Sequence, residues 1–274
     1  MAVKETITAN EASAARAFGK QAAVFDRLYG HDTVINYKRT RVRAHIENYL
    51  SPGARILELN AGTGEDAVYF ARRGYHVHAT DAAAQMLAIL HEKKQAFNLN
   101  ELITHEVCDF TGLRSLRDRG PYDAILSNFA GLNCTQQLDK VLHSLTPLVK
   151  INGTVTLVIL PRFCLWESLL LFRGKFRTAL RRFSGRKGSA ASVEGEPLQC
   201  WYYNPSFIVN HMKKDFDLLN IEGLCTFVPP SYLLGFAEKY PAFYRWLVKL
   251  EDRYKSSWPW KYTGDYYIIS LRRK

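Results

Sequence analysis

The sequence predicts an α/β fold built on a doubly wound, mostly parallel sheet with helices on both faces. Two observations support this prediction. Between residues 51 and 160, short apolar segments that are typical of buried strands alternate with helical segments, which is the order that a parallel sheet requires. The first of these strands runs directly into a two-glycine turn and a helix, a corner that positions ligands at the edge of such sheets.

The individual elements follow from apolar patterning and from glycine or proline punctuation. A helical N-terminal region, polar in composition, ends at the Ser-Pro-Gly of 51–53. Helices are then expected at 65–74, 82–97, 135–150 and 204–216. Strands are expected at 54–60, 75–81, 102–110, 121–128, 152–161, 216–228 and 264–274.

Two segments interrupt this alternation and are interpreted as insertions. Residues 161–203 are first apolar and basic and then rich in glycine and serine, whereas residues 229–262 are helical in pattern and aromatic. The expected organisation is a helical cap at 1–50, a cofactor-binding core at 51–160, the first insertion at 161–203, and the rest of the core at 204–274.

Charge and cysteine content restrict the class of protein. Lys and Arg outnumber Asp and Glu by 37 to 26, which favours an anionic partner such as phospholipid, nucleic acid or an acidic substrate. Five scattered cysteines without a CxxC pair indicate a reducing compartment. The sequence has no signal-peptide pattern and no apolar run of about 18 residues, so we expect a cytoplasmic protein.

The turn after the first strand fits two kinds of nucleotide cofactor by spacing alone. Gly62, Gly64 and Ala67 match a dinucleotide-binding fingerprint, and Asp81 ends the second strand, where an acid that binds ribose is expected. The non-functional alternative is an ordinary strand-turn-helix corner with solvated acids.

Charge discriminates between these cofactors. Glu58 ends the strand, and Glu65 and Asp66 occupy the first turn of the following helix. A pyrophosphate would be repelled by these carboxylates although it needs the helix N-terminus. A net cationic cofactor without phosphate, such as S-adenosylmethionine (SAM), suits them better. We expect no metal ion in the site.

The segment ILELNAGTG at 56–64 resembles motif I of the class I SAM-dependent methyltransferases, E-x-G-x-G-x-G. Glu58, Gly62 and Gly64 match the motif, and Asn60 stands at the first glycine. Asparagine enters left-handed backbone regions more readily than most residues, so the turn is expected to survive. The resemblance extends from 56 to 160 and implies a Rossmann-like, seven-stranded sheet with a helical cap and inserted lid segments.

The resemblance also implies roles for individual residues. Asp81 would accept hydrogen bonds from the ribose hydroxyls, and Asp109 would accept one from the adenine amino group. Tyr37, with Lys38 or Arg41, would bind the cofactor's carboxylate. The complete set of expected cofactor-binding residues is Tyr37, Arg41, Glu58, Asn60, Ala61, Gly62, Gly64, Asp81, Ala82, Met86, Asp109, Phe110, Ser127 and Asn128. Asp81 as a helix cap and Asp109 as a loop acid are the structural alternatives.

The implied reaction is methyl transfer by in-line displacement, which produces S-adenosylhomocysteine (SAH). Such a reaction depends mainly on proximity and alignment, so a general base is optional. His31 and Tyr37 are the candidates for a base, although a lone histidine is commonly structural. The fourth strand ends in SNFAGLN rather than N/D-P-P-Y/F, which disfavours nucleic-acid bases as acceptors.

The first insertion bears on the substrate. Residues 162–187 contain eight basic residues and a single acid, Glu167, with aromatic and leucine side chains between them. This pattern suits an anionic membrane surface, a lid over a hydrophobic substrate, or a packed cap with solvated arginines. Phe129, Trp166, Trp201 and Tyr202 are the candidate substrate residues.

The preferred hypothesis is a methyltransferase that acts on a small hydrophobic, aromatic or lipid-like acceptor. Oxygen is favoured over carbon or nitrogen as the atom that is methylated. An RNA methyltransferase, an NAD(P)-dependent oxidoreductase and a non-catalytic cofactor-binding protein stay open as alternatives. The sequence does not determine the oligomeric state.

Overall fold

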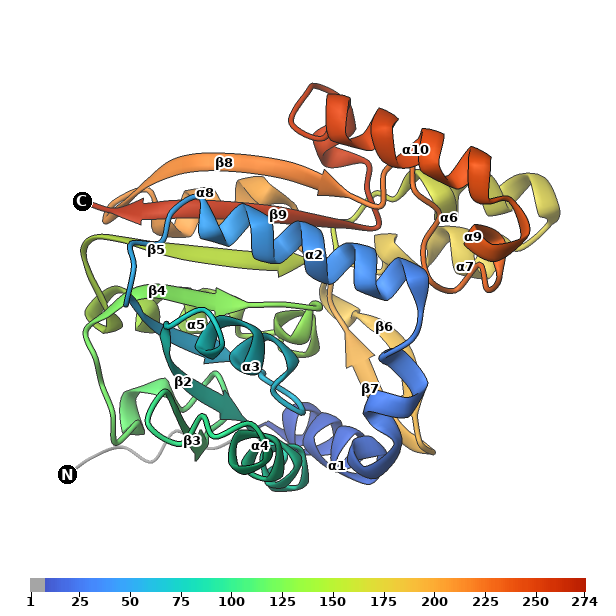
Figure 1. The fold of residues 1–274 in the computed structure, drawn as a ribbon. Helices are drawn as coiled ribbons and strands as arrows, with labels where there is room; N and C mark the ends of the chain where they lie inside the picture. Colours follow the sequence, from blue (N-terminus) through green and yellow to red (C-terminus); the bar gives the residue numbers. More distant parts are fainter. Residues whose placement is uncertain (1–7) are drawn as a thin grey trace.

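The computed structural model describes residues 8–274, in which seven strands form one sheet in the order β3-β2-β1-β4-β5-β9-β8 (Figure 1). Five strands are parallel, and β9 pairs antiparallel with both β5 and β8. The predicted doubly wound, mostly parallel sheet is confirmed. The strands of this sheet are β1 (Arg55–Leu59), β2 (His76–Asp81), β3 (Ile103–Val107), β4 (Tyr122–Ser127), β5 (Val149–Ile159), β8 (Phe216–Leu224) and β9 (Tyr266–Arg273).

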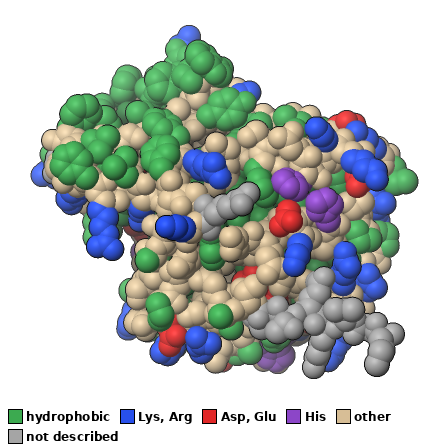
Figure 2. Space-filling view, turned by 180° about the vertical axis from the view of Figure 1, so that it is seen from behind, with side chains coloured by type: hydrophobic (Ala, Val, Ile, Leu, Met, Phe, Trp, Pro, Cys, Tyr) green, Lys and Arg blue, Asp and Glu red, His purple; other side chains and the backbone are tan. Residues whose placement is uncertain are grey.

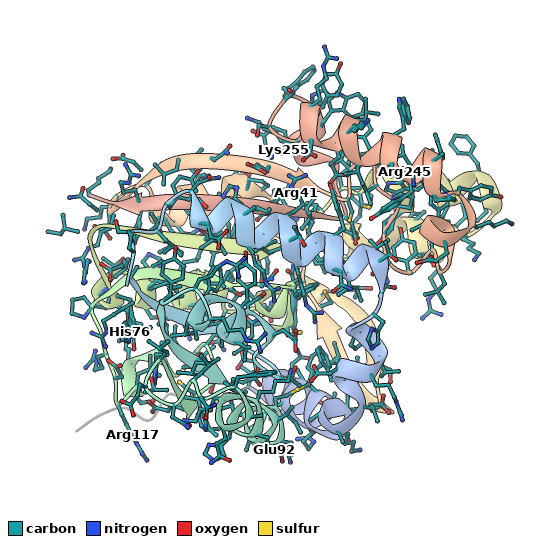
Figure 3. The ribbon with its side chains drawn as sticks, viewed as in Figure 1. Arg41, His76, Glu92, Arg117, Arg245 and Lys255 are labelled. Atoms are coloured by element: carbon teal, nitrogen blue, oxygen red, sulfur yellow. The ribbon has the colours of Figure 1, made fainter. Side chains whose placement is uncertain are left out.

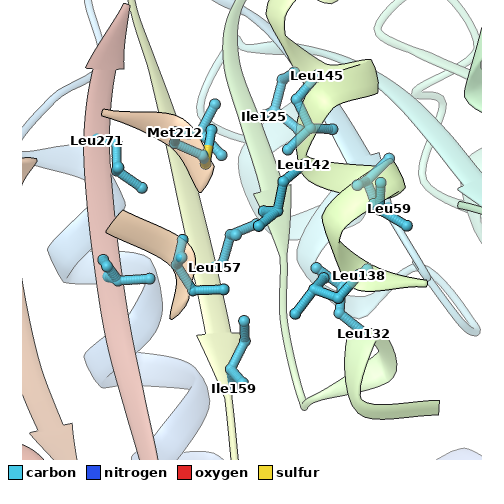
Figure 4. Packing of buried hydrophobic residues seen from close by; sticks show 14 of the residues in the cluster. Leu59, Ile125, Leu132, Leu138, Leu142, Leu145, Leu157, Ile159, Met212 and Leu271 are labelled. Carbon is cyan, nitrogen blue, oxygen red and sulfur yellow. The ribbon is translucent and has the colours of Figure 1, made fainter. Parts of the chain in front are cut away.

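Helices cover both faces of the sheet, and each face has its own apolar core. One core contains residues of α5 (Leu138–Leu145) and α8 (Pro205–Met212) packed on the central strands, with Leu142 and Met212 among them (Figure 4). The other core contains residues of α2 (Thr33–Glu47), α3 (Glu65–Ala71) and α4 (Ala84–Ala96), including Val42 and Phe70. The continuous apolar runs of β1 and β4 follow from this burial on both sides.

The N-terminal region forms two helices. Thr8 and Glu11 make a capping box that begins α1 (Ala9–Tyr29), and the Asp32 side chain accepts a hydrogen bond from the N–H of Ile35 to begin α2. The chain turns between these helices, so α1 lies along one edge of the molecule while α2 crosses a face of the sheet (Figure 1). Residues 1–7 of the expected cap lie outside the described residues.

The first insertion combines helical turns with a hairpin that was not expected from the sequence. Its helices are α6 (Leu165–Leu169) and α7 (Phe176–Leu180), and its strands β6 (Ser189–Val193) and β7 (Glu196–Cys200) form a separate two-stranded sheet. Glu194 and Gly195 join the strands with φ of 49° and 76°. Two consecutive positive φ angles are typical of a tight two-residue hairpin turn.

The second insertion contains α9 (Phe236–Lys239) and α10 (Pro241–Tyr254), and it lies beside α6 and α7 at one end of the sheet (Figure 1). Short 3₁₀ turns complete the connections: Leu113–Ser115, Gly131–Cys134, Thr146–Leu148, Leu170–Arg173, Arg181–Phe183, Gly185–Lys187 and Trp260–Tyr262. Within residues 8–274, no helix combines the length and apolar character needed to cross a bilayer.

Candidate active site

A cleft opens where β1, β2 and β4 end, at the carboxyl edge that parallel sheets commonly use for ligands. It consists of two adjoining cavities of about 290 and 130 Å³. Both cavities are lined by the same five residues, so they form one elongated space: Phe18, Phe25, Asn60, Gly62 and Phe129. The β1 turn therefore lies at the middle of the cleft.

Asn60 is accommodated at the motif's first glycine position because its backbone is left-handed, with φ of 47°. Its Nδ2 donates to the carbonyl oxygen of Asn128 at 2.7 Å, and its Oδ1 accepts from the Ser127 hydroxyl at 2.6 Å. The Asn60 side chain thereby joins the ends of β1 and β4. It also requires a glycine opposite, since a Cβ at Gly131 would lie 2.5 Å from Asn60 Cγ.

Asp81 lies at the boundary between the β1 turn and the smaller cavity. Its carboxylate accepts hydrogen bonds from the backbone N–H groups of Gly62 at 2.9 Å and Ala83 at 2.8 Å. Burial raises the pKa of this carboxyl, and the N–H groups of Ala83, Gly62 and Ala82 act against that shift. Asp81 is thus a cleft-lining acid and not the helix cap, because the N-cap position of α4 is Ala83 and no side chain of the described residues caps this helix.

Glu58 is the least compensated acid of the cleft. Its side chain is 3% exposed, and among the described residues nothing donates a hydrogen bond to its Oε2. Burial raises its pKa well above the usual range, the charge of Asp66 adds to the shift, and Arg43 opposes it. The backbone N–H of Ala67 also opposes the shift, but Oε2 has no donor in the described chain. A buried carboxylate oxygen without a donor is costly, so this atom is a candidate for contact with a cationic ligand.

The other two carboxylates of the turn have partners within the protein. Asp66 pairs with Arg43, whose Nε lies 2.6 Å from Oδ1, and it also accepts from Asn128 Nδ2 at 2.7 Å. Glu65 pairs with Lys93 at 2.5 Å. Arg43 and Lys93 therefore neutralise two of the three acids that the sequence places around this turn, and Glu58 is the distinctive negative group.

The end of β4 presents a bulky residue in a strained turn. Phe129 and Ala130 both have positive φ, 51° and 59°, which is uncommon for side chains with a Cβ. The Asn128 side chain accepts a hydrogen bond from the N–H of Phe129 at 2.7 Å, which stabilises this turn. Phe129 consequently lines both cavities, whereas Ser127 is buried beneath the turn.

The smaller cavity collects most of the residues expected around the adenine ring. Asp109 lines it, and its Oδ1 accepts the N–H groups of Thr111 and Gly112. Burial raises the pKa of the Cys108 thiol to about 12, so this cysteine is not a nucleophile at neutral pH. The expected residues that line this cavity are Asn60, Gly62, Asp81, Ala82, Met86, Asp109 and Phe110.

The larger cavity has two cations on its wall, both from α2. Lys38 is 3% exposed, and its Nζ lies 3.2 Å from the Ser231 hydroxyl and 4.8 Å from the centre of the Tyr266 ring. The Arg39 guanidinium lies 5.5 Å from the centre of the Phe129 ring, and its Nε has no partner among the residues that the structure describes. Neither cation has a carboxylate partner in the described chain, which suits an anionic ligand group.

Arg41 lies elsewhere, although the sequence placed it with Tyr37 at the cofactor's carboxylate. It reaches from α2 toward the second insertion and pairs with Glu222 at 3.0 Å and Asp252 at 3.1 Å (Figure 3). Tyr37 lies near Arg41 and its ring packs edge-on against Tyr244. Neither Tyr37 nor Arg41 lines the cleft, since these contacts hold them on another face of α2.

The remaining candidates also lie outside the cleft. His31 is exposed in the turn between α1 and α2, so neither suggested general base lines the cavities. Trp166 lines a hollow between the two insertions, and Trp201 and Tyr202 line another beside α8. Of the four expected substrate residues, only Phe129 lines the cleft.

Helix α1 covers the cleft and is fixed at both ends. Phe18 and Phe25 line both cavities. Asp26 joins α1 to the β1 turn, because its carboxylate accepts a hydrogen bond from the Thr63 hydroxyl at 2.6 Å. The β6–β7 hairpin holds the other side, where the Ser13 hydroxyl donates to the carbonyl oxygen of Pro197 at 2.6 Å. The sequence did not indicate this contact because the hairpin itself was not expected.

Known proteins have a similar fold. Residues 56–153 match a family model described as a methyltransferase domain, and no curated protein matches the chain. The crystal structure of the [4+2]-cyclase SpnF is similar at a TM-score of 0.64 and 14% identity, with 97% of each chain covered.

Two solved methyltransferases are also similar. The 1,6-didemethyltoxoflavin-N1-methyltransferase of Burkholderia thailandensis has a TM-score of 0.57 at 14% identity, with 99% of this chain and 93% of that chain covered. Geranyl diphosphate methyltransferase has a TM-score of 0.56 at 13% identity, with 87% and 85% covered. At these identities the structural likeness establishes the fold. The chain therefore has the fold of these methyltransferases, and its residues 56–153 match the methyltransferase domain.

Proposed function

We propose that the cleft binds SAM and that the protein transfers its methyl group to a small hydrophobic, aromatic or lipid-like acceptor, with oxygen as the favoured atom. The observation that carries this proposal is the unpartnered Oε2 of Glu58 in the cleft wall. An uncompensated carboxylate there favours a cationic donor and disfavours a dinucleotide. The solved 1,6-didemethyltoxoflavin-N1-methyltransferase contains SAH, which supports the same cofactor for this fold.

The smaller cavity is the proposed site of the adenosine part. Asp81 would bind the ribose hydroxyls, and Asp109 would bind the adenine amino group through Oδ2, which accepts no hydrogen bond from the described residues. Ala82, Met86 and Phe110 supply apolar walls for the ring. Asp81, Asp109 and Glu11 are the acids of this cavity, and its other walls are largely apolar.

The larger cavity is the proposed site of the methionine part. Lys38 and Arg39 would bind its carboxylate, in place of the pair Tyr37 and Arg41. Glu58 would accept a hydrogen bond from its ammonium group. These three residues present opposite charges on one cavity wall, as an amino acid zwitterion requires.

The acceptor would occupy the aromatic part of the same cavity. Phe18, Phe25, Tyr29, Phe129 and Tyr266 line it and would pack on a flat or apolar molecule. These side chains from α1, the turn after β4 and β9 would also exclude water from the space beside the β1 turn. The proposal therefore assigns the acceptor to this cavity and leaves Trp166, Trp201 and Tyr202 outside the site.

Bound SAM would supply a methyl group that is already activated on a sulfonium. The protein's own contribution is alignment, which is worth up to about 7–11 kcal/mol of barrier in well-oriented reactions. No histidine occurs among the described residues that line the cavities. The site therefore suits an acceptor oxygen that ionises without a general base, such as that of an acidic phenol or a carboxylic acid.

Turnover with a panel of acceptors tests the proposal. The full chain is incubated with SAM and phenols, hydroxylated aromatic acids or hydroxylated fatty acids, and SAH is measured against an acceptor-free control. Acceptor-dependent SAH supports the proposal. The likeness to a protein titled a cyclase makes SAM binding without methyl transfer the second candidate, and tight SAM binding with no SAH from any acceptor would favour it.

A further inference from the structure

The two insertions form one lobe beside the sheet, defined here as residues 161–187 and 229–262 (Figure 1). A hollow of about 470 Å³ lies between them, and residues from both insertions line it, including Trp166, Leu169, Tyr232 and Phe236. Arg182 fastens the first insertion to the core, with Nη2 2.7 Å from Glu167 and 2.6 Å from Asp265. The lobe is thus a packed unit with a defined surface.

The surface of this lobe is unusually apolar. Of the nineteen exposed large apolar side chains in residues 8–274, fourteen belong to the lobe, seven from each insertion. Phe172, Leu234 and Trp258 are 89%, 84% and 80% exposed. Figure 2 shows apolar side chains gathered over this end of the molecule. Soluble monomers rarely expose such groups together, so the lobe is expected to contact a partner.

The same surface is strongly basic. Glu238 and Asp252 are its only exposed acids among the described residues, and both have partners outside the lobe: the Thr33 hydroxyl and Arg41. Nine of the lobe's cations with described side chains are exposed: Arg162, Lys175, Arg177, Arg181, Lys187, Lys239, Arg245, Lys249 and Arg253. Apolar groups and exposed cations therefore share one surface, and of these nine cations only Arg181 has a carboxylate partner among the described residues, Glu167.

We propose that this lobe docks on the surface of an anionic phospholipid membrane, with both insertions in contact. Trp258, Tyr240 and Tyr262 are residue types that favour the boundary between headgroups and acyl chains, and the cations would lie among the phosphates. An acidic protein would match the cations but would need a shaped apolar partner for Phe172 and Leu234.

The docking surface adjoins the proposed acceptor cavity. Ser231, which lies 3.2 Å from Lys38 in the cleft, directly precedes Tyr232 in the hollow of the lobe. An acceptor that partitions into the bilayer would therefore be held close to the cleft. This assignment of a membrane-soluble acceptor rests on the proposed function, whereas the docking itself does not.

Co-sedimentation with lipid vesicles tests the docking. The full chain is mixed with vesicles of phosphatidylcholine alone or of equal parts phosphatidylcholine and phosphatidylglycerol. Binding to the anionic vesicles with little binding to the neutral ones is expected. No binding to either kind, or equal binding to both, would overturn the proposal, and no binding to either would leave an acidic protein as the occupant.

Two sets of substitutions locate the contact. A triple variant removes three exposed cations of the lobe: Lys175→Gln, Arg177→Gln and Arg245→Gln. It should bind anionic vesicles at least tenfold more weakly, since each cation contributes roughly a fivefold factor to the affinity for such vesicles. Arg114, Arg117 and Arg119 are exposed on the core, and their replacement by Gln is the matched control because it changes the net charge equally. Equal losses from the two triple variants would refute a specific surface.

Apolar insertion is tested in the same way. Phe172→Ser with Leu234→Ser should weaken vesicle binding, whereas Val107→Ser with Ile151→Ser, at exposed apolar positions of the core, should not. SAM affinity is measured by titration calorimetry in every variant and should stay within twofold of the unsubstituted protein. A failure of docking and a failure of the cofactor site thus give separate results.

Discussion

Replacing Glu58 by Gln tests the electrostatic account of the cleft most fully. The side chain is nearly isosteric, so the substitution removes the negative charge and keeps the packing at the end of β1. Because Oε2 has no partner in the described protein, its charge is costly in the ligand-free state and useful only with a cation bound. The variant should therefore be more stable and bind SAM more weakly.

The size of both effects follows from the burial of the carboxyl. Removing an unpaired buried carboxylate should stabilise the ligand-free protein by about 1–3 kcal/mol, or roughly 2–8 °C in Tm for a chain of this size. Losing a charge-assisted hydrogen bond to the ammonium group should weaken SAM binding by about 1.5–3 kcal/mol, roughly tenfold to 150-fold.

The pH dependence has a definite sign. The folded-state pKa of Glu58 is raised well above its ordinary value, mainly by burial. Its contribution to stability is therefore complete below the unfolded-state pKa and is lost as pH rises through the folded-state pKa. SAM affinity should rise over that same interval, because the cation binds the ionised carboxyl. Both dependences should be flatter in Glu58→Gln.

Thermal unfolding and titration calorimetry across neutral pH measure these effects. Glu92→Gln, at an exposed position on α4, is the matched control and should change neither quantity (Figure 3). SAM affinity equal to that of the unsubstituted protein in Glu58→Gln, or a loss of stability instead of a gain, would refute the reasoning.

Three further predictions concern other residues. Asp81→Asn should weaken SAM binding by about 1.5–3 kcal/mol in calorimetry, and unchanged affinity would mean that the ribose lies elsewhere. Lys38→Met should weaken SAM binding at least tenfold. Arg41→Met should lower the Tm and leave the SAM affinity of the folded protein unchanged. Weaker SAM binding in Arg41→Met with unchanged binding in Lys38→Met would restore Arg41 as the carboxylate ligand. For Glu222, burial raises the pKa, but the hydrogen bond from His45 and the nearby cations outweigh it and hold the pKa at about 2. Because this pKa is depressed in the folded state, Glu222 adds about 3 kcal/mol to the free energy of unfolding at pH values above its unfolded-state pKa, and this contribution is lost as pH falls toward 2. The free energy of unfolding of Glu222→Gln should therefore depend less on pH in the acid range. An unchanged acid dependence would contradict this assignment.

The central part of the site was predictable because it depends on local sequence and on strand order. Glu58, Gly62 and Asp81 follow two adjacent parallel strands, so their proximity follows once β1 and β2 are assigned. The left-handed backbone of Asn60 was also expected from its residue type, and the structure confirms it. The reciprocal need for glycine at Gly131 was not visible, since that contact joins two distant turns.

The positions that were misplaced depend on tertiary packing. Lys38 and Arg41, the two cations that the sequence offered for the cofactor's carboxylate, lie within one turn of α2. Lys38 lines the cleft, whereas Arg41 pairs with Glu222 and Asp252 on another face of the helix. A helical pattern does not determine which face meets the cleft when basic residues occur on several faces. The neutralisation of Asp66 by Arg43 was hidden for the same reason, as the pair joins α2 to α3.

The β6–β7 hairpin was missed because composition hid its turn. Glycine and serine at 184–195 suggested irregular structure, yet Glu194 and Gly195 form a two-residue connection between short strands. Recognising that turn would have placed Pro197 beside α1 and explained how α1 is held over the cleft. It would also have separated Trp201, directly after β7, from the acceptor cavity.

Titration calorimetry of the full chain with SAM, SAH and NAD tests the central claim most directly. We expect SAM and SAH to bind at one site, with SAM affinity that increases as Glu58 ionises, and NAD to give no binding heat. Saturable binding of NAD at the cleft, or no measurable binding of SAM at any pH, would contradict the account.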